Sequence, residues 1–154
     1  MKKLLAVVLF LASGFCILAQ EKTNDSLAIG LGLEWNMDSR HNFAGGAAFG
    51  VNYNLPGHFA VGLSFTGSNN FTGIIVLEPI VQLRCYLEEK TGYFIQFEAG
   101  TFIILEDGEV TPMPEFGLRL GYRQPLGHVL FIEPYGRIGY PFAFGLGLMA
   151  GIRF

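Results

Sequence analysis

The sequence contains few charges, few cysteines and no long apolar run. Charged residues make up 15% of the 154 residues, whereas 51% are hydrophobic. This composition is too apolar for a typical soluble domain. However, no internal stretch approaches the roughly 18–20 apolar residues that a transmembrane helix needs, because 21 Gly and 7 Pro interrupt the apolar segments. In a bilayer, such a chain satisfies its backbone hydrogen bonds only as a closed β-barrel.

Several kinds of functional site are also missing from the sequence. His41, His58 and His128 are isolated from one another, and no metal-binding motif is present. No phosphate-binding loop or nucleophile elbow occurs. Basic residues form no cluster, which excludes a nucleic-acid site of the usual kind. We therefore expect no metal, no cofactor and no nucleic-acid partner.

The N-terminus has the pattern of a secretory signal. Lys2 and Lys3 precede an apolar segment at residues 4–11, and small residues follow. This pattern predicts a signal peptide over residues 1–19 and export through the general secretory pathway. A single barrel domain is then expected over residues 20–154.

The two cysteines add one alternative. Acylation at Cys16 would make the chain a lipoprotein, but Phe15 is bulkier than the usual residue before such a cysteine. Cleavage after residue 19 removes Cys16 and leaves Cys85 alone. We therefore expect no intramolecular disulfide.

The rest of the chain divides into eight segments of alternating residues separated by turn signals. Large apolar side chains occupy one face of each segment, and Gly, Ala and polar side chains occupy the other. The first segment runs from Leu27 to Asn36. Representative members of the apolar face are Leu33, Trp35, Phe49, Leu63, Val81, Phe97, Leu118, Ile138, Phe142, Phe144 and Leu148.

The polarity of the two faces distinguishes two kinds of barrel. A soluble, lipocalin-like barrel has an apolar interior, and it remains the alternative. Here the bulky face is continuously apolar while the other face mixes small and charged residues. This arrangement predicts an all-β, eight-stranded, antiparallel up-and-down transmembrane barrel. Pro79 and Pro134 lie inside the apolar runs, so we expect a bulge or a loosened rung at each.

The connections predict an orientation. Short turns at 56–57, 89–92 and 125–127 would be periplasmic. Longer connections at 37–42, 67–70 and 106–112, and one near Pro141, would face outward. Aromatic residues would then form two girdles. The outer girdle would contain Trp35, Phe43, Phe71, Tyr140 and Phe142, and the inner one Tyr53, Tyr93, Tyr122 and Phe154.

Ten charged residues fall on the inward face: Glu34, Glu78, Arg84, Glu98, Glu115, Arg119, Arg123, Glu133, Arg137 and Arg153. An unpaired charge inside a narrow barrel is costly, so these side chains should pair. We expect pairing between neighbouring strands, Glu115 with Arg137 and Arg119 with Glu133. A plug of ion pairs is the favoured interpretation, and a gated proton or ion path is the alternative.

The last strand, FAFGLGLMAGIRF, places Phe144, Ile152 and Phe154 in outward apolar positions. It resembles the C-terminal signal read by the barrel assembly machinery. Together with the eight strands and the girdles, it resembles the transmembrane domain of outer-membrane protein A and its X-type relatives. The resemblance implies a bacterial outer-membrane location, with outer-membrane lipids, periplasmic chaperones and the assembly machinery as partners.

Three functions remain open at this stage. A structural or interaction role in the cell envelope is favoured, and a narrow channel for small solutes is the first alternative. The second is a lipid-modifying enzyme, for which the loop Asp38, Ser39, Arg40 and His41 is the one compact set of catalytic residue types. We expect the chain not to be an enzyme. The oligomeric state is left open.

Overall fold

The computed structural model describes residues 26–38, 42–71, 73–88 and 90–154. The predicted signal peptide and Cys16 lie outside these residues. Eight strands are present: β1 (Leu27–Asp38), β2 (Phe43–Asn54), β3 (Phe59–Asn69), β4 (Ile75–Tyr86), β5 (Gly92–Glu106), β6 (Glu109–Leu126), β7 (Leu130–Tyr140) and β8 (Phe142–Arg153). In the described part of the chain, no helix is long and apolar enough to cross a membrane.

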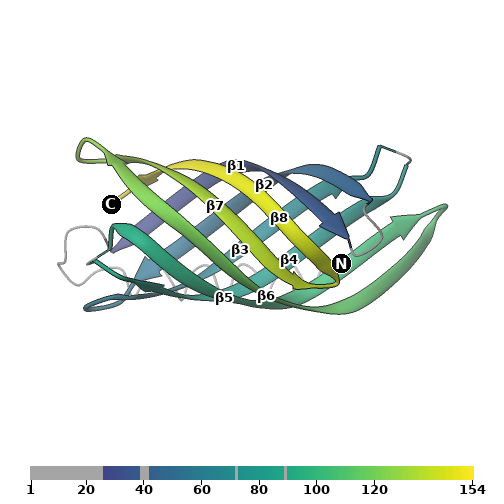
Figure 1. The fold of residues 1–154 in the computed structure, drawn as a ribbon, viewed down its shortest axis with the longest axis horizontal. Helices are drawn as coiled ribbons and strands as arrows, with labels where there is room; N and C mark the ends of the chain where they lie inside the picture. The colour runs from purple at the N-terminus through teal and green to yellow at the C-terminus, as the bar shows by residue number, and fades with distance from the viewer. Residues whose placement is uncertain (1–25, 39–41, 72, 89) are drawn as a thin grey trace, which may run out of the picture.

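The strands pair in chain order, each antiparallel to the next, and β8 pairs with β1 to close the barrel (Figure 1). The predicted all-β, eight-stranded barrel is therefore confirmed. Closure leaves no free sheet edge along most of the wall, so nearly every backbone group is paired within the protein.

Short connections join the strands at both ends. A single residue, Pro141, joins β7 to β8, and the two-residue turn Asp107–Gly108 joins β5 to β6. Both residues of the Asp107–Gly108 turn have positive φ (49° and 84°). Positive φ at both central residues defines a type I′ hairpin turn, and Asp-Gly is one of its preferred sequences. The β5–β6 hairpin reaches further from the barrel than its neighbours (Figure 1). At this end the strands extend beyond their predicted limits, because residues 67–69 belong to β3 and Pro112 belongs to β6.

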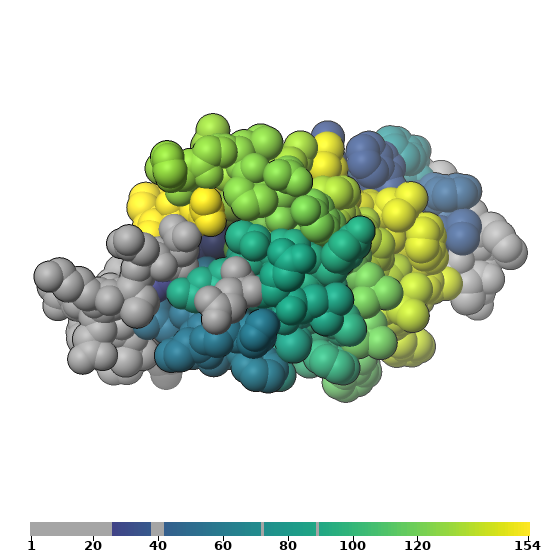
Figure 2. Space-filling model, turned by 60° about the vertical axis from the view of Figure 1, so that its left-hand side comes forward, coloured from purple at the N-terminus to yellow at the C-terminus, as the bar shows by residue number. Residues whose placement is uncertain are grey.

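The two faces of the strands have the polarity of a membrane barrel. Large apolar side chains such as Leu33, Val81 and Leu120 are exposed on the outer face, while alternate positions are buried in the interior. In the space-filling view, the side chains of β5, β6 and β7 form a continuous surface (Figure 2). The soluble-barrel alternative required an apolar interior and a polar exterior, and the structure shows the reverse.

Phe142 corrects one part of the predicted pattern. Sequence alternation placed it on the outer face and in the outer girdle, but it is 2% exposed and lies inside the barrel. The β1–β8 register shifts between Met37 and Asp38, so Phe142 rather than Ala143 lies opposite Asp38. A one-residue shift reverses the face that a side chain occupies. The outer-girdle prediction for Phe142 is therefore wrong.

Pro79 and Pro134 each interrupt the pairing between two strands but do not shift the register of that pairing. Pairing of β4 with β5 stops at Leu77 and resumes at Ile80, leaving out Pro79. A similar gap lies beside Pro134, between β6 and β7. The register on either side of each gap is the same, so these are loosened rungs rather than bulges.

Candidate functional site

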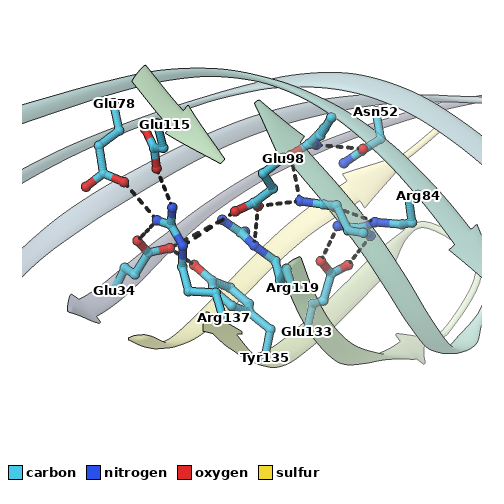
Figure 3. A network of polar contacts seen from close by, with 12 residues as sticks. Glu34, Asn52, Glu78, Arg84, Glu98, Glu115, Arg119, Glu133, Tyr135 and Arg137 are labelled. Atoms are coloured by element: carbon cyan, nitrogen blue, oxygen red, sulfur yellow. Dashed lines mark hydrogen bonds and ion pairs between the residues drawn. The ribbon is translucent and has the colours of Figure 1, made fainter. Parts of the chain in front are cut away.

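Among the described residues, nine charged side chains are buried in the barrel interior. Five are glutamates and four are arginines, and none is more than 4% exposed. They are Glu34, Glu78, Glu98, Glu115, Glu133, Arg84, Arg119, Arg123 and Arg137. Ionised groups this deeply buried must pair, because each loses its hydration. They form two clusters along the barrel axis (Figure 3).

The inner cluster, defined as Glu133, Arg84 and Arg123, lies toward the end of the barrel where β1 begins and β8 ends. Arg84 donates two hydrogen bonds to the Glu133 carboxylate, at 2.9 and 2.8 Å. Arg123 donates a third through Nε at 2.8 Å. Arg84 is on β4 and Glu133 is on β7, strands that are not neighbours in the wall. Their contact therefore crosses the lumen.

The outer cluster centres on Arg137, which contacts four carboxylates. Its Nη1 lies 2.5 Å from Glu34 and 2.9 Å from Glu78, and its Nη2 lies 2.6 Å from Glu115. Its Nε is 3.4 Å from Glu98. These four glutamates come from β1, β4, β5 and β6, so one guanidinium on β7 connects five of the eight strands (Figure 3).

Arg119 is the second arginine of the outer cluster. Its Nε lies 2.7 Å from Glu98, and its Nη2 lies 3.4 Å from Glu34. The Tyr135 hydroxyl donates a further hydrogen bond to Glu34 at 2.8 Å. Together with Arg137, these residues fill the middle of the lumen.

A chain of amides connects the two clusters. Gln96 accepts a hydrogen bond from Arg84 Nε at 2.8 Å, and it donates to Glu98 at 2.7 Å and to Gln82 at 2.8 Å. Gln82 in turn donates to Asn52 at 2.8 Å. The interior is thus one connected polar network, in which a change at one cluster reaches the other through Gln96.

Each buried arginine also lies over an aromatic ring. The guanidinium carbon lies 3.8–4.3 Å from the nearest ring centroid in each case; the pairs are Arg84 with Phe94, Arg119 with Tyr135, Arg123 with Phe131 and Arg137 with Phe142. A desolvated cation over a ring face contributes about 2 kcal/mol. The rings therefore supply part of the stabilisation that water would otherwise provide.

The predicted ion pairs are partly correct. Glu115 contacts Arg137 as expected. The pairing of Arg119 with Glu133 is wrong, because the β6–β7 register places Arg119 opposite Arg137. Arg119 therefore turns to Glu98, and Glu133 binds Arg84 and Arg123 instead. The prediction considered only adjacent strands and so missed the contacts across the lumen.

Arg153 lies apart from this network. It is partly exposed near the end of β8, and its Nη2 donates to the carbonyl of Gly127 in the β6–β7 turn at 3.0 Å. The predicted assembly-signal residues Phe144, Ile152 and Phe154 are exposed on the outer face, as their alternation indicates. Their role in assembly remains a prediction.

Sequence reasoning missed the inward phenylalanines. Phe94 and Phe131 alternate with the buried side chains Gln96 and Glu133 on their own strands. Alternation along the strand therefore predicts that both side chains point inward, although large aromatic side chains are more typical of the lipid-facing side. Phe142 could not be found in this way, because its position depends on the β1–β8 irregularity.

Three residues of the loop considered for lipid chemistry, 39–41, are not among the described residues. Within the described residues, no group of three or more His, Cys, Asp or Glu side chains has the geometry of a metal site. The arrangement of the described interior is that of a network of ion pairs.

The sequence matches no protein-family model and no curated protein. The fold resembles Neisserial surface protein A, with 9% identity and a TM-score of 0.62 over 86% of this chain and 98% of that chain. It also resembles the N-terminal β-barrel domain of Pseudomonas aeruginosa OprF (11%, TM-score 0.58, 86% and 100%). A third match is Ail, the attachment invasion locus protein of Yersinia pestis (12%, TM-score 0.56, 87% and 100%). The chain therefore has the fold of the small eight-stranded outer-membrane barrels.

Proposed function

We propose that this chain is an integral protein of the bacterial outer membrane with a structural or interaction role in the envelope, and that its barrel does not conduct. The apolar outer face fits a lipid environment. The fold shared with outer-membrane barrels supports the location.

The buried network is the observation that carries this proposal. Arg84 and Glu133 meet across the lumen, and Arg137 on β7 contacts both Glu34 on β1 and Glu78 on β4. An eight-stranded barrel is just wide enough to be filled by its own side chains. An ion passing through would have to separate several desolvated ion pairs, which makes a steady current unfavourable.

Current recordings in planar bilayers test this proposal. The wild-type barrel should give no steady single-channel conductance. The double variant Arg84→Ala/Glu133→Ala removes both partners of one cross-lumen pair, so it should conduct more than the wild type. Glu109→Gln, at the exposed end of the β5–β6 hairpin, serves as the control and should behave as the wild type does.

A large steady conductance in the wild type would contradict the closed barrel. The narrow channel for small solutes would then become the better hypothesis. Folding of each variant is checked beforehand by far-UV circular dichroism, so that a missing current is not caused by a missing barrel.

A further inference from the structure

A cavity of about 360 Å³ opens at the end of the barrel that bears the β1–β2, β3–β4, β5–β6 and β7–β8 connections. Much of its wall is apolar and is formed by Val76, Phe102, Ile104, Met113 and Phe142. A cavity of this size and composition suits a small ligand with an apolar body.

Among the described residues that line this cavity, the two charged ones are both acidic. Glu78 lies at its floor and Glu106 at its rim, and no Lys or Arg is among the described residues that line it. A ligand entering from the exterior therefore meets negative charge at both levels. This arrangement disfavours an anion and attracts a cation.

The carboxylate of Glu78 is only partly satisfied. Arg137 binds its Oε2 at 2.9 Å, but Oε1 accepts a single long contact of 3.5 Å, from Asn36 Nδ2. Glu115 approaches Glu78 closely enough for the two carboxyl groups to share a hydrogen bond when one of them carries a proton. Without that proton, Glu115 Oε2 has no hydrogen-bond partner.

The outer cluster as a whole also carries excess negative charge. Four glutamates in it face only two arginines, Arg119 and Arg137, whereas in the inner cluster two arginines share one glutamate. Buried carboxylates in excess need a proton or a further cation. Of the four glutamates in the outer cluster, Glu78 is the one that lines the cavity.

Asn36 lies beside Glu78 in the wall of the cavity. Its Nδ2 donates to Glu34 at 2.9 Å and contacts Glu78, while its Oδ1 accepts no hydrogen bond although the residue is only 6% exposed. The Asn36 amide therefore donates to the two glutamates but adds no positive charge to balance them. A ligand ammonium group would take the place of this amide when the Asn36 side chain rotates aside.

From this geometry we propose that the outer cavity binds a small organic cation, a primary ammonium group carried on an apolar body. The ammonium group donates to Glu78 and compensates the excess negative charge. The apolar body packs against Phe102 and Ile104. Binding at this site requires no open pore and goes beyond the structural role proposed above.

Calorimetric titration of the refolded barrel in zwitterionic detergent tests the proposal. The probes are benzylammonium and benzyl alcohol, which have similar size and differ in charge at neutral pH. Benzylammonium should bind at least about tenfold more tightly than benzyl alcohol, since it alone pairs with the buried carboxylate. Equal affinity for the two probes would overturn the proposal.

Two variants locate the site. Glu78→Gln removes the charge and should weaken benzylammonium binding by at least about tenfold. Ala44→Phe fills the cavity without changing any charge, so it should also abolish binding and serves if Glu78→Gln does not fold. Glu109→Gln does not line the cavity and should leave binding unchanged.

The site would be contradicted if Glu78→Gln and Ala44→Phe both bind benzylammonium with wild-type affinity. If Glu78→Gln does not fold, wild-type affinity in Ala44→Phe would by itself contradict the site. The titration is independent of the conductance measurement, so the two proposals can fail separately.

Discussion

The four buried arginines each bind at least one carboxylate and lie over an aromatic ring. For Arg84, the carboxylate is Glu133 and the ring is Phe94. The guanidinium group suits this position because its planar donors match a carboxylate while its face stacks on a ring. A lysine could not make both contacts with the same geometry. The interior is therefore specified by residue type as well as by charge.

Glycine opposite a large side chain is a second feature at this scale. A Cβ atom added at Gly147 would lie 2.1 Å from Cζ of Tyr135. Gly147 thus leaves the space in which the Tyr135 ring lies beneath Arg119 and reaches Glu34. The alternation of small and large inward residues allows the network to fit inside a narrow barrel.

Substitution of Glu133 tests whether water reaches the ion pairs of the inner cluster. Glu133→Gln leaves Arg84 and Arg123 buried without their carboxylate, so the free energy of unfolding should fall by about 3–5 kcal/mol. Urea unfolding of the barrel in lipid vesicles, followed by tryptophan fluorescence, measures this change. The exposed Glu109→Gln should change it by less than about 0.5 kcal/mol. A loss below about 1 kcal/mol for Glu133→Gln would indicate a solvated pair.

At the scale of elements, β6 is longer than the strand beside it. Its pairing with β7 begins at Phe116, so residues 109–115 have a free edge on that side. Pairing with β5 is continuous through Pro112 and Pro114. The N–H groups that these prolines lack therefore belong to the free edge. Prolines on an exposed edge prevent another strand from adding to it.

Restoring those N–H groups should make the hairpin self-associate. We expect Pro112→Thr/Pro114→Thr to form concentration-dependent dimers in detergent, detected by analytical ultracentrifugation, because the free edge regains two donors. Val110→Thr, on the same exposed edge, is the control and should sediment as the wild type does. If the double variant sediments like the wild type at every concentration, the prolines have no protective role.

At the scale of the whole molecule, the barrel has a charged interior and an apolar exterior. Exposed Trp35 and Phe43 lie toward one end, and Tyr93 and Tyr122, whose ring centroids are 4.8 Å apart, lie toward the other. Aromatic residues at two levels are typical of the two interfaces of a bilayer. The molecule therefore has the surface of a protein that spans a membrane.

This surface leads to a prediction for the protein in cells. The chain should fractionate with outer membranes, give a β-type far-UV spectrum, and migrate faster on gels when unheated, because the closed sheet resists detergent. Gel electrophoresis of membrane fractions with and without boiling is the measurement. Recovery in the soluble periplasmic fraction, or a helical spectrum, would contradict it.

Much of the architecture could be predicted because it depends on local pattern. Alternation along each segment shows which side chains share a face, and the size of those side chains shows which face meets lipid. The connection predicted over 106–112 is shorter in the structure, where only Asp107 and Gly108 lie between β5 and β6. The closed barrel, its polarity and the set of buried charges were therefore determined by the sequence alone, apart from Arg153.

Only the tertiary structure decided which of those charges meet. Arg84 and Glu133 are 49 residues apart, and Arg137 and Glu34 are 103 apart. Their contacts depend on the stagger of the strands around the barrel, which places side chains of distant strands at the same height in the lumen. The inward turn of Phe142 depends on a single irregularity between β1 and β8. Local pattern assigns a side chain to the interior, but the register of the closed sheet decides its partner.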